Sequence, residues 1–97
     1  GYFDLVFTAG VLIHINPKDL KGVMSEIYRT SGKYIWGYEY YSPKHATIDY
    51  RGNKNYAWKG DFSKLYRNYF PRLKLVKKHR LKYLNSNNID EMFLLKK

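Results

Sequence analysis

Residues 1–41 read GYFDLVFTAGVLIHINPKDLKGVMSEIYRTSGKYIWGYEYY, and this stretch decides the fold. It begins with a short, nearly continuous apolar run at Phe3, Leu5, Val6 and Phe7. Such a run is typical of a strand buried on both faces of a parallel sheet. We therefore predict a first strand over residues 2–8.

The next segment has the signals of a helix over residues 17–31. Asn16 is a good N-cap, Pro17 suits the first helical position, and Asp19 places negative charge at the positive end of the helix dipole. Gly32 stands where a left-handed C-terminal cap is expected. One apolar stripe follows the helical period and consists of Leu20, Val23, Met24, Ile27 and Tyr28.

Two more segments follow at the usual lengths of a strand and a helix. Residues 33–41 are rich in aromatics and predict a strand, with Tyr34, Trp36, Tyr38 and Tyr40 on one face. Residues 42–60 show no sustained period and indicate a long loop. A second helix is predicted over 61–70, with Asp61 as its cap, and Pro71 ends it. Its apolar stripe consists of Phe62, Leu65, Tyr66 and Tyr69.

The end of the chain predicts a hairpin of strands 73–84 and 89–96, joined by a polar turn. Apolar and charged residues alternate in the first of these strands, which predicts one solvent-exposed face. This alternation puts Leu73, Leu75, Leu81 and Tyr83 on one side with Lys77 and His79, and Lys74, Lys78, Arg80 and Lys82 on the other with Val76.

The order of elements is therefore strand, helix, strand, long loop, helix and two strands. This alternation predicts an α/β fold in three layers, with a parallel sheet, helices packed on it, and one antiparallel strand at the end. Residues 1–97 form a single partial domain in this prediction, because the chain has no internal repeat or linker.

Composition excludes several classes of protein. Hydrophobic residues make up 44% of the 97 residues and aromatics 19%, which is too apolar for a disordered chain despite a net charge of +10. No segment approaches the roughly 20 apolar residues of a membrane span. The chain has no cysteine, which excludes a disulfide scaffold and a thiolate site and fits a cytoplasmic protein. His14, His45 and His79 match no common zinc spacing, so we expect no metal site.

The chain opens directly in the first predicted strand, without an initiator Met or a signal segment. We therefore expect it to be the later part of a longer protein whose upstream sequence is missing. The first strand would then keep an unpaired apolar edge. We expect the isolated chain to be marginally stable or to self-associate through that edge.

Several short strings in the sequence resemble a known enzyme family. FDLVFT at residues 3–8, followed by GVLIHI at 10–15, resembles the fourth strand and following turn of class I S-adenosylmethionine-dependent methyltransferases. The order of elements resembles the second half of that fold. The longer string GVLIHINP at 10–17, with EYYSP at 39–43, YRG at 50–52 and KGDF at 59–62, is similar to the methylases associated with pseudaminic acid biosynthesis. The resemblance covers nearly the whole chain, and Ser42 departs from it where Asn is expected.

The resemblance implies S-adenosylmethionine as cofactor and a small polar methyl acceptor, such as a sugar or sugar derivative in surface-glycan synthesis. The family's glycine-rich turn and its ribose-binding acidic residue would lie upstream, and no Gly-x-Gly occurs in these 97 residues. Close backbone approach to a nucleoside needs that glycine turn. We therefore expect this chain to bind the cofactor poorly when it is alone.

The candidate cofactor and catalytic residues follow the first strand. Thr8, Ala9 and Gly10 lie just past its carboxyl end, where open α/β sheets bind ligands, and the resemblance places the methionine end of the cofactor there. His14 is the candidate general base or hydrogen-bond donor to the acceptor. The alternatives are an ordinary tight connection and a structural histidine.

The candidate acceptor residues lie at the end of the second strand and beyond it. Carboxylate and aromatic groups at Glu39, Tyr40 and Tyr41 would converge on the same edge as Thr8, or else pack as a strand end. Tyr50, Arg51 and Gly52 lie in the long loop, where Arg51 would meet an anionic ligand in two hydrogen bonds, or else form a solvated turn. Asp61 is first of all the helix cap, and an acceptor contact is the second interpretation.

A different class of function remains open, a basic non-enzymatic α/β domain that contacts nucleic acid. Phosphates attract cations, and bases stack on aromatic rings. In the sequence, however, the aromatics concentrate in residues 34–58 and the cations in a later strand. Lysine on an edge strand also protects against pairing with other chains. The cations in question are Arg72, Lys74, Lys77, Lys78, Arg80 and Lys82.

Overall fold

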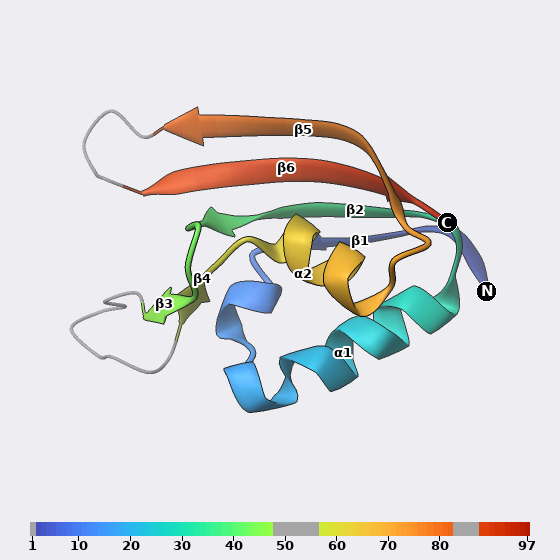
Figure 1. The fold of residues 1–97 in the computed structure, drawn as a ribbon, viewed down its shortest axis with the longest axis horizontal. Coiled ribbons are helices and arrows are strands. Elements are labelled where there is room, and N and C mark those ends of the chain that lie inside the picture. The colour runs from blue at the N-terminus through green and yellow to red at the C-terminus, as the bar shows by residue number, and fades with distance from the viewer. Residues whose placement is uncertain (1, 48–56, 83–87) are drawn as a thin grey trace.

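The computed structural model describes residues 2–47, 57–82 and 88–97 of the chain. All six predicted strands and helices are confirmed, and those of their ends that fall in the described residues shift by two residues at most. Figure 1 shows β1 (Phe3–Ala9), the short 3-10 helix η1 (Leu12–His14), α1 (Pro17–Thr30), β2 (Ser31–Tyr41), β3 (Ala46–Thr47), β4 (Trp58–Lys59), α2 (Phe62–Tyr69), β5 (Lys74–Lys82) and β6 (Ile89–Lys96). Neither α1 nor α2 has the length and apolar character needed to cross a bilayer, and the described residues contain no other α-helix.

The main sheet has four strands in the order β1-β2-β6-β5. β1 and β2 are parallel, and β6 is antiparallel to both of its neighbours, β2 and β5. It follows that β5 runs parallel to β1 and β2. The prediction of a parallel sheet that ends in one antiparallel strand is therefore confirmed, and in the described residues β1 lies at an edge of the sheet.

The three-layer prediction is wrong, because both helices pack on the same face of the sheet. The connections β1-α1-β2 and β2-α2-β5 both join parallel strands, and both move across the sheet in the same direction. Right-handed crossovers in one direction place their helices on one face. The fold therefore has two layers, and the described elements leave the other face of the sheet uncovered (Figure 1).

The bare face corrects the prediction that the first strand is buried on both sides. Phe3, Leu5 and Phe7 are 61%, 49% and 64% exposed. In β1, Thr8 is buried because it pairs with Gly37, a residue on the helix-covered face. The apolar run correctly predicted a strand. It did not predict that one face of this strand is left exposed.

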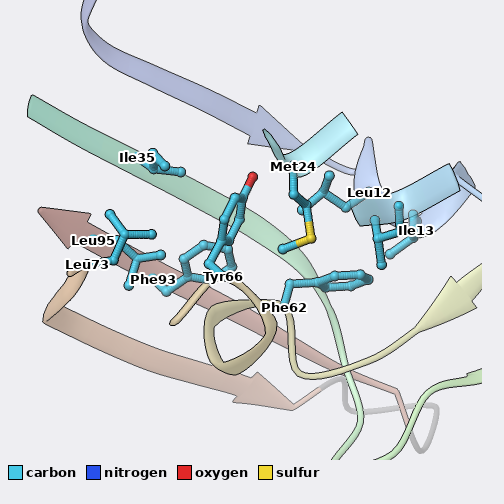
Figure 2. Packing of buried hydrophobic residues seen from close by; sticks show 10 residues of the cluster. Leu12, Ile13, Met24, Ile35, Phe62, Tyr66, Leu73, Phe93 and Leu95 are labelled. Carbon is cyan, nitrogen blue, oxygen red and sulfur yellow. The ribbon is translucent and has the colours of Figure 1, made fainter. Parts of the chain in front are cut away.

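The hydrophobic core lies between the helices and the covered face of the sheet. Tyr66 of α2 packs its ring 6.0 Å from the ring of Phe93 in β6. Phe93 in turn lies over Gly37 in β2, where a Cβ would collide with its ring. The members of the cluster come from η1, α1, β2, α2 and β6, with Leu73 between α2 and β5, and Figure 2 shows how they pack: Leu12, Ile13, Leu20, Met24, Ile35, Phe62, Tyr66, Leu73, Phe93 and Leu95.

An irregularity in β5 overturns the predicted alternation of that strand. The pairing with β6 shifts by one residue between Leu75 and Lys77, so that Val76 is an extra residue. Beyond such a bulge the side chains exchange faces. Arg80 consequently pairs with Glu91 on the covered face, and Leu81 is 42% exposed instead of sharing a face with Leu75.

Two smaller expectations also change. Gly32 is not a left-handed cap, because α1 ends at Thr30 and β2 starts at once at Ser31, which is extended. The predicted loop of residues 42–60 contains the short antiparallel pair β3 and β4, and Tyr41 bridges to Gly60. The middle of that loop lies outside the described residues.

Two glycine substitutions should move stability in opposite directions. We expect Gly37→Ala to lower the free energy of unfolding by about 1–3 kcal/mol, because the added methyl group overpacks the core against Phe93. Gly22→Ala is the matched control on α1, where a Cβ meets nothing within 4 Å. It should raise stability by about 0.5–1 kcal/mol, and urea unfolding measures both. Equal effects at the two sites would contradict the close packing at Gly37.

The bare face and the free edge of β1 should cause concentration-dependent association. We expect Phe7→Lys to weaken this association at least tenfold in sedimentation velocity experiments, because it places a charge on the apolar edge strand. Val76→Lys makes the same change at the bulge in β5, where Val76 is 53% exposed, and should have a much smaller effect. A wild-type chain that stays monomeric at high concentration would contradict this prediction.

Candidate functional site

A pocket of about 270 Å³ lies where β1 and β2 end. These parallel strands place their carboxyl ends at one edge of the sheet, which is where open α/β sheets bind ligands. The described lining residues are Gly10, Ile13, His14, Tyr38, Glu39, Tyr40 and Asp90. The structure thus brings together four of the predicted site residues, Gly10, His14, Glu39 and Tyr40.

Gly10 turns the chain out of β1 and into η1. Its φ of +66° lies in the left-handed region, which side chains with a Cβ rarely adopt. Its backbone N–H donates to the Tyr38 carbonyl at 2.9 Å, which fixes the turn to β2. The N–H of His14 then donates to the Val11 carbonyl at 3.0 Å, so the backbone of the candidate base is held within a short helical turn.

Glu39 fastens this turn to the end of β2. Its side chain is buried, and its two carboxylate oxygens accept from the N–H groups of Val11 and Ile13, each at 3.4 Å. Burial raises the pKa of Glu39, and hydrogen bonds from the Thr8 side chain and from the backbone of η1 oppose that rise. The backbone bonds are long, so they offset the loss of hydration only in part. The Glu39 carboxylate therefore accepts hydrogen bonds from the protein's own backbone, and Glu39 also lines the pocket.

The charge of the Glu39 carboxylate also acts on Tyr66, a residue of the hydrophobic core. Its hydroxyl is buried and has no hydrogen-bond partner among the described residues. Burial and the charge of Glu39 both raise the pKa of Tyr66, so the phenol stays neutral. One carboxylate thus lies between the pocket and the core.

Asp90 is a pocket residue that the sequence reasoning missed. It is 5% exposed and pairs with Tyr40 across the β2–β6 ladder. Burial, followed by the charge of Asp90 and a side-chain hydrogen bond with it, raises the pKa of Tyr38. The sequence offered one signal, the two acidic residues Asp90 and Glu91 in the otherwise mainly apolar strand Ile89–Lys96, but nothing in the sequence indicated that this strand lies beside β2.

Tyr41 lies outside the pocket and belongs to an ionic cluster. The Arg80 guanidinium lies 3.9 Å from the centre of the Tyr41 ring, and its Nε donates to Glu91 Oε2 at 2.8 Å. Ser63 Oγ lies 3.2 Å from both Glu91 Oε1 and Asp61 Oδ1. These contacts join the start of α2 to the β5–β6 hairpin.

Asp61 is confirmed as the cap of α2, since its carboxylate accepts from the Lys64 N–H at 3.2 Å. It lines a second hollow of about 210 Å³, together with Pro43, His45, Lys64, Leu65 and Asn68. Asp61 therefore does not join His14 in the first pocket. An acceptor contact by Asp61 remains a prediction that would require a second subsite.

Thr8 and Ala9 are not among the described lining residues of the first pocket. Thr8 is buried and its side chain bonds to Glu39, and Ala9 is exposed at the end of β1. Tyr50, Arg51 and Gly52 lie outside the described residues. β5 contributes no described lining residue to the first pocket and forms the edge of the sheet opposite β1.

The raised pKa of Glu39 predicts a specific pH dependence of stability. A carboxyl group with a higher pKa in the folded state holds its proton more tightly there, so folding loses stability as the pH rises from the ordinary value of 4.5 through the raised one. We expect urea unfolding at a series of pH values to show this decline in the wild type and its loss in Glu39→Gln. Glu26→Gln, which removes an exposed carboxylate from α1, should retain the decline. A difference between wild type and Glu39→Gln that is the same at every pH would contradict the assignment.

Comparison with known proteins identified no family for this chain. Neither a scan against protein-family models nor a search of curated proteins gave a match for the chain. What can be concluded about the site therefore rests on its own residues, a pocket at the carboxyl ends of two parallel strands, with a histidine, two tyrosines and two carboxylates in its wall.

Proposed function

We propose that the pocket between β1, η1 and β2 is the methyl-transfer end of the active site of an S-adenosylmethionine-dependent methyltransferase that acts on a small polar acceptor. One observation carries the proposal. The strings GVLIH at 10–14 and EYY at 39–41 both resemble that family, and residues from both strings line one pocket although they are more than 20 residues apart in sequence. The order strand, helix, strand, helix and terminal hairpin is also the order that the resemblance implies.

The pocket fits part of the cofactor and not the whole of it. Its volume of about 270 Å³ lies below the roughly 300–1,000 Å³ of most ligand sites. At Gly10 an added Cβ would meet nothing within 4 Å, which leaves open space beside the backbone of the turn. When bound, S-adenosylmethionine would supply an electrophilic methyl group on its sulfonium. In this proposal the nucleoside end of the cofactor lies outside this pocket.

In this proposal the protein contributes position and a proton acceptor. Methyl transfer is an in-line displacement, so holding the acceptor atom in place provides much of the acceleration. His14 lies at the rim of the pocket and would take the proton of an acceptor hydroxyl. Tyr40 would hold the acceptor from the end of β2, and Glu39 would keep the turn that carries His14 in place.

The nucleic-acid alternative has weaker support in this fold. Its cations, Lys74, Lys77, Lys78 and Lys82, lie along the edge strand β5. The stacked pair Trp36 and Tyr38 lies on β2, and β6 separates the two strands. The cations and rings are therefore not interleaved along one binding track, and lysine is a common protection of an edge strand.

Titration of the labelled chain with S-adenosylhomocysteine distinguishes the two functions. We expect weak binding, with amide shifts in NMR spectra centred on Gly10, His14 and Tyr40, because the chain offers only part of a cofactor site. A single-stranded oligonucleotide serves as the comparison ligand. Oligonucleotide shifts along β5 with a steep salt dependence, together with no response to S-adenosylhomocysteine, would favour the nucleic-acid function and contradict the proposal.

A further inference from the structure

The buried hydroxyl of Tyr66 and the carboxylate of Glu39 lie near each other in the core without being paired. Tyr66 packs on Phe93, which covers Gly37, and Glu39 is the next residue of β2 on that covered face. The charge of Glu39 acts on Tyr66, whose hydroxyl is buried and has no hydrogen-bond partner among the described residues. An unpaired buried hydroxyl costs stability and requires an explanation.

The η1 turn explains why the two groups are not paired. An ionised carboxylate offers about four acceptor positions. Those of Glu39 are taken by one side chain and by the backbone of the turn, namely by Thr8 Oγ1, Val11, Leu12 and Ile13. The turn and the Tyr66 hydroxyl therefore compete for one carboxylate, and in this structure the turn holds it.

The hydrogen bonds that hold the turn are weak. Those from Val11 and Ile13 to Glu39 are both 3.4 Å long, and the usual length is about 2.9–3.0 Å. Val11 is 44% exposed, so water would replace the carboxylate at its N–H group. A bond from the Tyr66 hydroxyl to an ionised carboxylate is charge-assisted and therefore strong. The loss of the turn's bonds is thus offset by a new bond in the core.

The turn has a hinge where it leaves β1. Gly10 has a φ of +66°, and an added Cβ there would meet nothing within 4 Å, so its backbone has space to rotate. Leu12 and Ile13, by contrast, keep their side chains in the core. A movement about Gly10 is therefore a small shift of the backbone of the turn and not its unfolding.

We propose that Glu39 is a latch with two positions, in which its carboxylate accepts either from the backbone of η1, as observed, or from the Tyr66 hydroxyl, which releases η1. Ile13 and His14 line the pocket, so release of the turn changes the shape of its wall. Tyr66 is a positioning residue, because it acts on the pocket through Glu39. The latch regulates the proposed site, and it rests on the proposed function only for the role of His14 as a base.

Hydrogen exchange of backbone amides, followed by NMR in the full 97-residue chain without ligand, measures how often the turn is released. We expect Tyr66→Phe to slow exchange at Val11 and Ile13 by about three- to tenfold, because the released turn then lacks its substitute donor. The Asp19 amide donates to the Asn16 carbonyl at 2.8 Å at the start of α1, and its exchange should not change.

Two further variants show whether the effect passes through Glu39. Tyr69→Phe is the matched control, since it removes a hydroxyl from the same helix, and it should leave exchange in the turn unchanged. Glu39→Gln should speed exchange in the turn, because an amide oxygen offers fewer acceptor positions than a carboxylate. In the Glu39→Gln background, Tyr66→Phe should change the exchange by less than about twofold, because the carboxylate for which it competes is gone.

Four results would overturn the latch. These are unchanged or faster exchange at Val11 and Ile13 in Tyr66→Phe, an equal slowing at Asp19, the same slowing in Tyr69→Phe, and the full effect of Tyr66→Phe in folded Glu39→Gln. If Glu39→Gln does not fold, the comparison of Tyr66→Phe with Tyr69→Phe still decides.

No ligand enters this experiment, so its result is independent of the titration with S-adenosylhomocysteine. A chain that binds S-adenosylhomocysteine but shows no change of exchange in Tyr66→Phe retains the methyltransferase proposal and loses the latch. A chain with the predicted exchange and no affinity for S-adenosylhomocysteine has a turn with two positions, and the methyltransferase proposal then fails.

Discussion

The packing of Phe93 on Gly37 fixes the register between β2 and β6, and most of the structure depends on that register. A ring fits over β2 only where the residue has no side chain, and Gly37 is such a residue. A slip of one residue would exchange the two faces of β6. Asp90 would then leave the pocket and Glu91 would leave Arg80. One packing contact in the core therefore sets the composition of a site at the end of the sheet.

The direction of the two crossover connections decides which face of the sheet the helices cover. Because both helices lie on one face, the core is built from that side alone, and Phe3 and Phe7 of β1 lie exposed on the other side. Phe7 and Trp36 form an edge-to-face pair there, with ring centres 6.2 Å apart. The chain thus presents a large apolar surface beside a free strand edge, two features that favour association.

Hydrogen bonds to β2 hold the backbone of the candidate site, and carboxylates line its pocket. The turn at Gly10 is held by a backbone bond to β2, and the following turn of η1 is held by the buried carboxylate of Glu39. His14 is therefore carried on a backbone whose position depends on two strands. The Lys and Arg residues that the structure describes lie mostly on exposed positions, whereas the described lining of the pocket contains Glu39 and Asp90 and no Lys or Arg.

The amino-acid sequence by itself determined the elements and part of the site. Asn16 and Pro17 start α1, Asp61 starts α2, and the strand ends at Gly10 and Glu39 reach one pocket, because these features depend on local geometry and on the rule that parallel strands end on the same side. The tertiary structure alone decided the layers, the bulge at Val76 and the place of Asp90. Each of these depends on which distant segment lies beside a residue, and the periodicity of a single strand or helix contains no information about its neighbours.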